Sequence, residues 1–285
     1  MRCLLRRGSR DALARLQRLG TPAATVALLR NTAHGRAAGI ECLLLRKAKE
    51  RRFGKFWVFP GGALEPQDEV FHTDDTRGMD VLASAANAAV RELAEESEQH
   101  VDARTLTFFS HWTPPPAERE RGKVFSTFFF AAAQPQPDAQ SAQSVQVDRS
   151  EISAHQWISP DDALSCHAAG GLPLLPPTFM TLSMLAQHRG KRVDAALAAI
   201  AGADPIVYET RAARLADGRT AFMWEGDAGW ATSDADARGS KRHRLIASHD
   251  PTSTKDESVA AGLAQGTVTL AFDGDGVVHK KGVAR

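Results

Sequence analysis

The sequence predicts an α/β (α+β) fold over residues 21–202, followed by a β-rich segment over residues 203–285. Apolar runs of strand length lie between turn-forming residues, and longer segments with helical spacing come between and after them. Beyond Gly202, short alternating runs surround Asp217-Gly218 and Asp273-Gly274, which are turn signals. The 285 residues suffice for one core and an appendage.

Strands and helices can be assigned in order along the chain. Residues 23–30 and 40–47 are apolar runs joined by a polar, glycine-bearing stretch, which predicts a β-hairpin. We expect further strands over residues 57–59, 105–112, 124–132 and 155–158, and helices over residues 81–99, 161–167, 177–188 and 193–201. Strand-like runs over residues 205–215, 220–224 and 267–272 follow, and the Gln-, Pro- and Ser-rich stretch 134–150 predicts a solvated loop.

Composition excludes several classes of protein. The formal net charge is +1, so no broad field favours nucleic acid or a membrane surface. No apolar run is long enough to cross a bilayer. Cys3, Cys42 and Cys166 are far apart and odd in number, so we expect neither a disulfide framework nor a zinc site. A cytoplasmic location suits them.

The first 20 residues alternate arginine with leucine. We interpret residues 1–20 as a basic lead-in helix that packs on the domain or frays, and an organellar transit peptide is the alternative. The final Val283-Ala284-Arg285 is not a peroxisomal signal of the Ser-Lys-Leu kind. The basic residues 238–244 could contact phosphate, although a solvated loop is the simpler interpretation.

The run Arg91-Glu92-Leu93-Ala94-Glu95-Glu96 holds three carboxylates at positions i, i+3 and i+4 of an expected helix. This spacing directs all three toward one point. Like charges one turn apart destabilise a helix by roughly 0.2 to 0.5 kcal/mol per pair, so a positive partner is expected. The run is therefore a candidate site for a hard divalent cation, and a solvated acidic face is the alternative.

Upstream, the apolar run Phe56-Trp57-Val58-Phe59 enters a Pro60-Gly61-Gly62 break, where the backbone can approach a ligand closely. Together the two stretches resemble the Nudix box, which has a glycine, five residues, a glutamate, seven residues and Arg-Glu-apolar-any-Glu-Glu. Gly62 falls on the box glycine, Arg91 on its arginine, and Glu92, Glu95 and Glu96 on its metal ligands.

The chain departs from this pattern at three places. Asp68 stands where the family has its first glutamate, and Glu98 replaces the glycine that ends the family's helix. Residues 69–90 stand where the family has seven residues, an insertion of about fifteen residues that costs little in closure entropy and is expected in a surface loop.

The split box resembles the branch that includes the coenzyme A diphosphatases, and the resemblance covers residues 21–185. Further matches are Phe109-Ser110-His111-Trp112-Thr113-Pro114, Phe125-Ser126-Thr127-Phe128-Phe129-Phe130, Gln156-Trp157-Ile158-Ser159-Pro160 and Leu174-Leu175-Pro176-Pro177-Thr178-Phe179. The Arg-Arg-Phe-Asp-Thr common in that branch is Lys123-Val124-Phe125-Ser126-Thr127 here, without two of its charges. Phe128, Phe129 and Phe130 are expected to be largely core, and so is Trp157.

The resemblance implies a Nudix fold, a mixed β-sheet sandwiched between helices, and a site for Mg²⁺ or Mn²⁺. Glu92, Glu95, Glu96 and the carbonyl of Gly61 would hold the metal, and Arg91 would fix one carboxylate. The base would be Glu95 or Glu96, with His111, Glu118 and Glu120 as outside candidates. Gly62, Arg46 and Lys47 would contact substrate, although exposed basic residues at a strand end are common.

The expected activity is metal-dependent hydrolysis of a diphosphate linkage in a nucleoside diphosphate derivative, with coenzyme A or acyl-CoA as the leading substrate. One alternative is a general ADP-ribose, nucleotide-sugar or dinucleotide pyrophosphatase. The other is a Nudix-fold module that senses a nucleotide without cutting it. We expect a small-molecule substrate and no nucleic-acid or membrane partner, and a homodimer is left open.

Overall fold

The computed structural model describes residues 20–32, 38–49, 54–72, 78–116, 124–135, 145–147, 150–239, 241–247 and 268–272. Its strands are β1 (Thr21–Asn31), β2 (Ile40–Lys47), β3 (Trp57–Val58), β4 (Gly61–Ala63), β5 (Thr107–Thr113), β6 (Phe125–Ala133), β7 (Ile152–Ile158), β8 (Ile206–Glu209), β9 (Arg211–Arg214), β10 (Thr220–Met223), β11 (His243–Ala247) and β12 (Val268–Phe272). Its helices are α2 (Val81–Ser97), α4 (Pro160–Ala168), α5 (Pro176–Ala186) and α6 (Val193–Ala201), with 3-10 turns η2 (Pro66–Asp68) and η3 (Ala103–Thr105).

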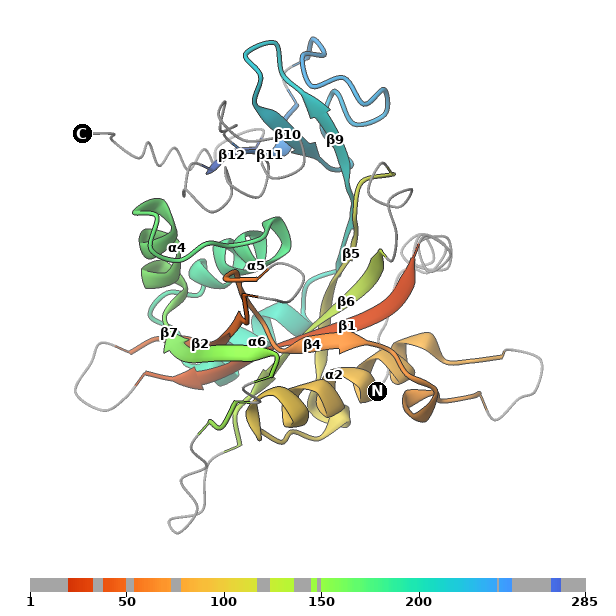
Figure 1. Ribbon diagram of the computed structural model, residues 1–285, viewed down its shortest axis with the longest axis vertical. Coiled ribbons are helices and arrows are strands. Elements are labelled where there is room, and N and C mark those ends of the chain that lie inside the picture. Colours follow the sequence, from red (N-terminus) through yellow and green to blue (C-terminus); the bar gives the residue numbers. More distant parts are fainter. Residues whose placement is uncertain are drawn as a thin grey trace.

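A large mixed sheet organises the chain (Figure 1). Its strands run in the order β3-β2-β1-β6-β5-β8, and β4 and β7 add to β1 and β2. Strands β1 and β2 pair antiparallel, which confirms the expected hairpin, whereas β1 and β6 pair in parallel. The central β1 is therefore bordered on both sides and lies deep in the sheet.

Helices cover both faces of this sheet (Figure 1). Successive side chains of a strand point to opposite faces. Accordingly Leu28 packs in a core with helix α2, and Leu29 packs in a second core with α4, α5 and α6. The expected mixed sheet between helices is confirmed, and continuous burial along β1 is explained by its having a core on each side.

The aromatic run in β6 is core on both faces. Phe128 and Phe130 pack with α2, and Phe129 packs on the opposite face; all three are buried. Trp157 in β7 is partly buried against the α2 core, and the guanidinium of Arg30 lies 4.4 Å from its ring centroid. The expectation that these rings are packing residues is confirmed.

Beyond residue 202 the chain contributes to two sheets. The strand-like run expected over residues 205–215 forms two strands, because the chain leaves the first sheet at Thr210. Strand β8 pairs in parallel with β5 of the large sheet, and β9 begins a second sheet of order β12-β11-β10-β9. Strand β11 was not anticipated, since its basic residues suggested a loop. The division into residues 21–202 and 203–285 stays a prediction.

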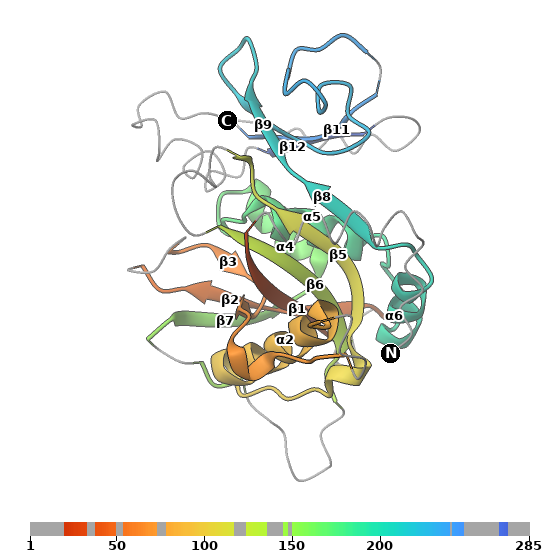
Figure 2. The same ribbon diagram turned by 90° about the vertical axis from the view of Figure 1, so that its right-hand side faces the viewer.

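An aromatic cluster joins the two sheets. Figure 2 shows strand β8 running up into β9. Trp112 of β5 stacks on Tyr208 of β8, with ring centroids 3.8 Å apart. Trp224, which follows β10, packs edge-on against both rings at 5.4 and 5.3 Å. Its indole nitrogen donates to Thr210 Oγ1 at 3.0 Å. The second sheet is therefore anchored on the large sheet by buried aromatic contacts.

Helix α2 begins and ends with defined caps. The carboxylate of Asp80 accepts a hydrogen bond from the amide of Ala83 at 3.0 Å. We expected the helix to reach residue 99, but it ends at Ser97 because Glu98 adopts a left-handed conformation with φ of 53°. Glu98 takes the conformation for which the family uses glycine, so the replacement changes the energy of the helix end and not its geometry.

Some expectations fall on residues that the structure does not describe. They are the lead-in over residues 1–19, Glu118, Glu120 and most of the loop 134–150, of which the described positions carry no helix or strand.

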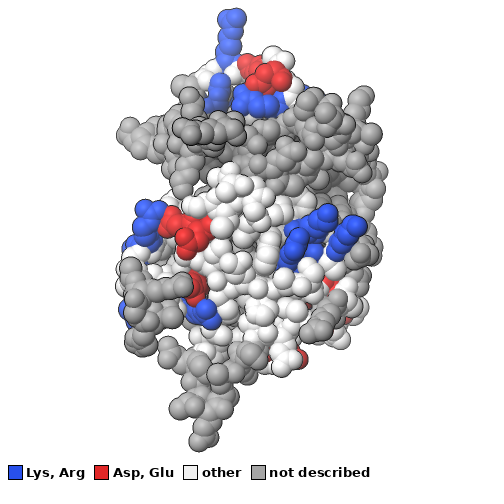
Figure 3. Space-filling model, turned by 60° about the vertical axis from the view of Figure 1, so that its left-hand side comes forward, with Lys and Arg blue, Asp and Glu red and all other residues white. Residues whose placement is uncertain are grey.

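In the described part of the chain, no helix has the length and apolarity to span a membrane. On the face drawn in Figure 3, charged side chains form separate small groups among neutral residues.

Candidate functional site

The Gly61-Gly62 break forms the short strand β4, which pairs with the start of β1. The side chain of Thr25 donates a hydrogen bond to the carbonyl oxygen of Pro60, which fixes the turn into β4. A Cβ atom at residue 61 would lie 2.4 Å from the carbonyl oxygen of Ala24. Only glycine fits here, and this close pairing brings the strand against helix α2.

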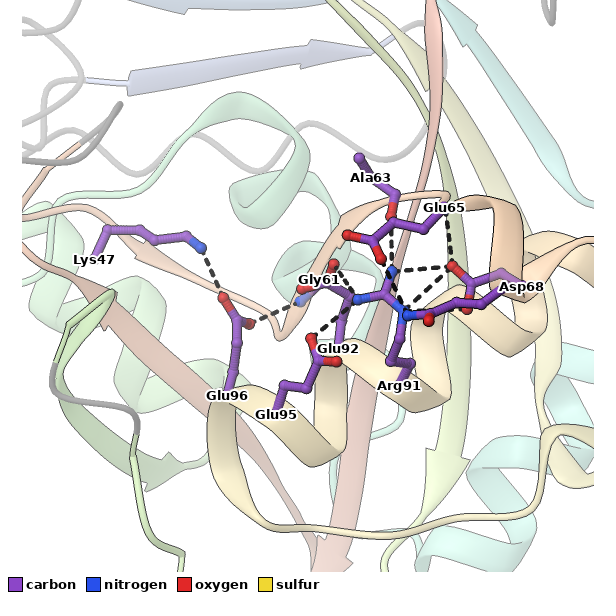
Figure 4. A network of polar contacts seen from close by, with 10 residues as sticks. Lys47, Gly61, Ala63, Glu65, Asp68, Arg91, Glu92, Glu95 and Glu96 are labelled. Carbon is purple, nitrogen blue, oxygen red and sulfur yellow. Dashed lines mark hydrogen bonds and ion pairs between the residues drawn. The ribbon is translucent and has the colours of Figure 1, made fainter.

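Arg91 is the centre of the polar network beneath β4 (Figure 4). Its Nε and Nη2 donate to the buried carboxylate of Asp68 at 3.0 to 3.3 Å, and Nη2 also donates to the carbonyl of Ala63 at 2.9 Å. Its Nη1 donates to Glu92 and Glu95, both at 3.0 Å. Arg91 therefore joins η2, β4 and two of the helix carboxylates.

Asp68 is a buried carboxylate that joins the turn η2 to helix α2. One carboxylate oxygen accepts the backbone amide of Glu65 at 2.9 Å and also faces Arg91. Asn87 of helix α2 donates to the carbonyl of Asp68 at 3.2 Å. The shorter side chain reaches its partners because η2 places residue 68 directly against α2. The substitution of Asp for Glu thus preserves the contact to Arg91.

Glu92 lies directly under Gly62, and a Cβ atom there would be 2.3 Å from Glu92 Oε1. Burial raises the pKa of the Glu92 carboxyl above its ordinary value; Arg91 opposes this shift, and the charges of Glu96 and Glu95 add to it. The second glycine therefore leaves room for the carboxylate of Glu92, which a Cβ atom would push aside.

Glu96 is the buried member of the carboxylate group, with its side chain only 6% exposed. Its Oε1 lies 2.7 Å from Lys47 Nζ of strand β2, and its Oε2 accepts the backbone amide of Gly61 at 3.0 Å. Burial raises the pKa of this carboxyl, and Lys47 and the Gly61 amide oppose the shift. Both oxygens of Glu96 are thus held in place.

Glu95 lies between these two positions on the helix surface, and its side chain is 57% exposed. Its ion pair with Arg91 is of the i, i+4 kind, which contributes only a few tenths of a kcal/mol on a helix surface. Of the three glutamates, Glu95 is therefore the one with a carboxylate open to solvent and free to turn.

The donor set suits a hard divalent cation. Glu92, Glu95 and Glu96 offer carboxylate oxygens within two turns of one helix, and Gly61 stands beside Glu96. Over the described ranges, no three acidic, histidine or cysteine side chains are grouped as a metal site as they stand. Arg91 and Lys47 hold the three carboxylates, so a metal would require the glutamates to exchange partners.

The two basic residues expected at the substrate differ in position. Lys47 faces α2 and pairs with Glu96, whereas Arg46 is exposed one residue earlier in β2. Leu45 packs in the α2 core and Leu44 in the opposite one, so strand alternation places Arg46 on the face away from Glu96. The structure therefore brings Lys47, and not Arg46, to the carboxylates.

His111 does not lie where a general base would act. It is fully buried between strands, its Nε2 is 2.9 Å from Ser126 Oγ, and its ring packs edge-on against Phe128. Burial lowers the pKa of His111 to about 4. A neutral, enclosed imidazole cannot take a proton from water at the surface, so this outside candidate is wrong.

Glu151 is a nearby acidic residue that our reading of the sequence missed. Its backbone carbonyl accepts the amide of Ala48 at 2.8 Å, just beyond Lys47. Its negative charge adds to the rise in the pKa of Glu96. Glu151 directly precedes β7, but only the pairing of β7 with β2 reveals how near it lies to α2.

Comparison with known proteins gives one family. Residues 20–176 match the family model described as NUDIX domain, which is more than half of the chain. No curated protein matches the chain.

Several solved structures have a similar fold. The chain resembles a NUDIX hydrolase from Alicyclobacillus acidocaldarius with 23% identity, over 63% of this chain and 96% of that one, at a TM-score of 0.48. The Ap4A hydrolase of C. elegans in a binary complex gives 20% identity, 59% and 96% coverage and 0.37. The NUDIX domain of Shewanella oneidensis NrtR, crystallised with ADP ribose, gives 18% identity, 59% and 87% coverage and 0.39.

Proposed function

The chain belongs to the Nudix hydrolase family, and from this premise we propose that it hydrolyses the diphosphate linkage of coenzyme A or an acyl-CoA. One observation carries the proposed chemistry: Glu92, Glu95 and Glu96 share one side of α2 directly beneath the Gly61-Gly62 strand. The choice of substrate is supported by the split box and by the ordered matches downstream of it. The products are adenosine 3',5'-bisphosphate and phosphopantetheine or its acyl derivative.

Mg²⁺ or Mn²⁺ is the proposed cofactor, because carboxylates are the ligands these ions prefer. Glu92, Glu95, Glu96 and the carbonyl of Gly61 would hold it. A bound divalent cation offsets the negative charge of the diphosphate and lowers the pKa of water. The two raised carboxyl pKa values support this assignment, since two carboxylates crowded in a buried position favour binding of a cation.

The residues of the chain have separate proposed roles. Arg91 positions Glu92 and Glu95, because its other hydrogen bonds fix the guanidinium against Asp68 and Ala63. Glu95 is the proposed base for the attacking water, since it is exposed and only weakly held. Glu96 is the other candidate that the sequence suggests, but both of its oxygens are engaged in a buried position.

The experiment is a panel of diphosphates, with products identified by mass spectrometry in the presence and absence of Mg²⁺ or Mn²⁺. The panel contains coenzyme A, acetyl-CoA, ADP-ribose, a nucleotide sugar and a dinucleoside polyphosphate. We expect metal-dependent release of adenosine 3',5'-bisphosphate, with coenzyme A derivatives turned over fastest. Fast turnover of ADP-ribose or a dinucleotide without turnover of coenzyme A would reject the substrate.

The matched variant is Glu95→Gln, which keeps the shape of the side chain and removes its charge. We expect kcat to fall by about 10² to 10⁴, the usual contribution of general base catalysis. The control is Glu98→Gln, one position beyond the end of α2, where an exposed carboxylate lies outside the network. Unchanged kcat in Glu95→Gln would remove its assigned role, and no turnover of any substrate would favour a nucleotide-sensing module.

A cytoplasmic location, the homodimer and the absence of nucleic-acid and membrane partners stay predictions. The location and the absence of nucleic-acid and membrane partners rest on composition, and the homodimer is left open.

A further inference from the structure

Lys47 supplies positive charge to the carboxylate group from a different element. It is the last residue of β2, and its Nζ lies 2.7 Å from Glu96 Oε1. Figure 4 shows the side chain extended across the gap between β2 and α2. The side chain is 21% exposed, so the protein encloses it only in part. Lys47 therefore neutralises the negative charge of Glu96, which a divalent cation could also neutralise.

Arg91 and Lys47 differ in how firmly they are held. Arg91 makes hydrogen bonds to Asp68 and Ala63 in addition to its two glutamates, so its guanidinium is fixed from several directions. Lys47 pairs with a single carboxylate oxygen, Glu96 Oε1, at 2.7 Å. Lysine is also a flexible point charge that can move without losing a planar, multidentate geometry. Of the two cations, Lys47 is the one that can be displaced.

We propose that Lys47 is an exchangeable counterion: it neutralises Glu96 in the metal-free enzyme, is displaced when a divalent cation binds, and then pairs with a phosphate of the substrate. This inference rests on the proposed function, because it takes the α2 carboxylates to be the metal site. It makes metal binding and substrate binding cooperative, since the released ammonium becomes available to an anion beside the site.

The charges around Glu96 support this exchange. Glu92 and Glu95 lie on α2 with Glu96 and both pair with Arg91, so three carboxylates share two cations, Arg91 and Lys47, and the group keeps a net negative charge. A cation and an ammonium compete for Glu96 because each needs the same carboxylate. Once displaced, Lys47 remains tethered to the sheet, within reach of the site and partly exposed.

The first experiment measures Mn²⁺ affinity by calorimetry, without substrate, in the wild type, Lys47→Met and Lys49→Met. Lys49 is an exposed lysine two residues later, so Lys49→Met removes the same charge and the same side chain outside the ion pair. We expect Lys47→Met to bind Mn²⁺ about three- to tenfold tighter than the wild type, because the competing ammonium is gone. Lys49→Met should stay within about twofold.

Equal Mn²⁺ affinities for Lys47→Met and Lys49→Met, or weaker Mn²⁺ binding by Lys47→Met, would contradict the proposal that the metal displaces Lys47 from Glu96. The variant Glu96→Gln separates this failure from failure of the proposed function. If the wild type binds no Mn²⁺, or if Glu96→Gln binds as tightly as the wild type, the metal site itself is wrong and both inferences fall.

The second experiment follows the ammonium directly by acetylation of lysines in the wild-type protein, mapped by mass spectrometry. Lys49 and Lys55, exposed at the same end of the sheet, are internal controls. We expect labelling of Lys47 to rise about threefold on addition of Mg²⁺ and to fall again when α,β-methylene-ADP, a hydrolysis-resistant diphosphate, is added. If the labelling of Lys47 does not change with Mg²⁺, Lys47 is not displaced from Glu96. If the labelling does not change with the diphosphate, Lys47 does not pair with a substrate phosphate.

Discussion

Gly62 and Glu92 are in contact across the space between β4 and α2, such that a Cβ atom on residue 62 would lie 2.3 Å from Glu92 Oε1. Glycine at residue 62 leaves this carboxylate in place, whereas a Cβ atom would push it aside. The same side chain is held from its other side by Arg91 at 3.0 Å. Residue 62 and Arg91 together define where the first of the three carboxylates lies.

Gly62→Ala should therefore move the carboxylate of Glu92 and lower kcat by about 10²-fold, the usual effect of displacing a catalytic group by about 1 Å. Steady-state kinetics with a diphosphate substrate would show this. The control is Gly171→Ala, because a Cβ atom there meets only an ordinary contact at 3.6 Å. If Gly62→Ala keeps the wild-type kcat, with the fold intact by circular dichroism, then kcat does not depend on the position of the Glu92 carboxylate.

Glu98 carries the energetic cost of ending α2 without a glycine. Its φ of 53° is a left-handed conformation that costs an L-residue roughly 1 to 2 kcal/mol. Glu98→Gly should stabilise the protein by about 1 kcal/mol, after part of the gain is lost to the greater chain entropy of glycine. Urea denaturation measures this. Glu98→Ala keeps the Cβ atom and should give no such gain; equal stabilisation by both variants would instead implicate the carboxylate.

His111 should make the stability depend on pH. Its pKa is about 4 in the folded protein, against 6.5 when exposed, so the unfolded chain binds the proton more readily. Its neutral form contributes full stability above pH 6.5, and that contribution falls as the pH drops toward 4, by a few kcal/mol in total. Denaturation midpoints between pH 7 and 4 test this in the wild type and His111→Gln. The control is His100→Gln at the surface, and identical pH slopes in the wild type and His111→Gln would contradict the assignment.

Asp227 and Arg244 form a buried ion pair that holds the second sheet together. Arg244 also donates to the carbonyl of Ala235, and Asp227 accepts the backbone amide of His243 at 2.9 Å. Arg244→Met leaves a buried carboxylate unpaired and should destabilise the protein by about 3 to 5 kcal/mol. Arg219→Met breaks the exposed pair with Asp217 and should cost no more than about 1 kcal/mol. Equal losses in thermal denaturation would show that Arg244 is not buried in solution.

Much of the scaffold was predictable because its patterns are local. The apolar runs of β1 and β2 and the aromatic run of β6 have the length and residue types of strands, and the structure confirms them. Spacing predicted that the α2 carboxylates share a helix face, since positions three and four apart do so. Their interpretation as a metal site depended on the resemblance to the Nudix box. What these patterns could not give was the orientation of Arg46, because β2 is apolar on both faces and its sequence does not show which face packs against α2.

The remaining errors concern contacts between distant residues. Lys47 and Glu96 are 49 positions apart, and only the packing of β2 beside α2 shows that they are paired. Arg244 was interpreted as part of a solvated basic loop because Asp227, its partner, is 17 positions away. Glu151 was missed for the same reason, since it comes near Glu96 only when β7 pairs with β2. Sequence spacing reports neighbours along one element, and these pairs form only when separate elements pack.

The most direct test is to grow crystals of the protein with Mn²⁺ and to locate the metal by its anomalous scattering. The account predicts a peak bounded by Glu92, Glu95 and Glu96, with carboxylate oxygens within ~2.5 Å and Lys47 turned away from Glu96. A peak at another place, or an unchanged Lys47–Glu96 ion pair with no metal at saturating Mn²⁺, would contradict it.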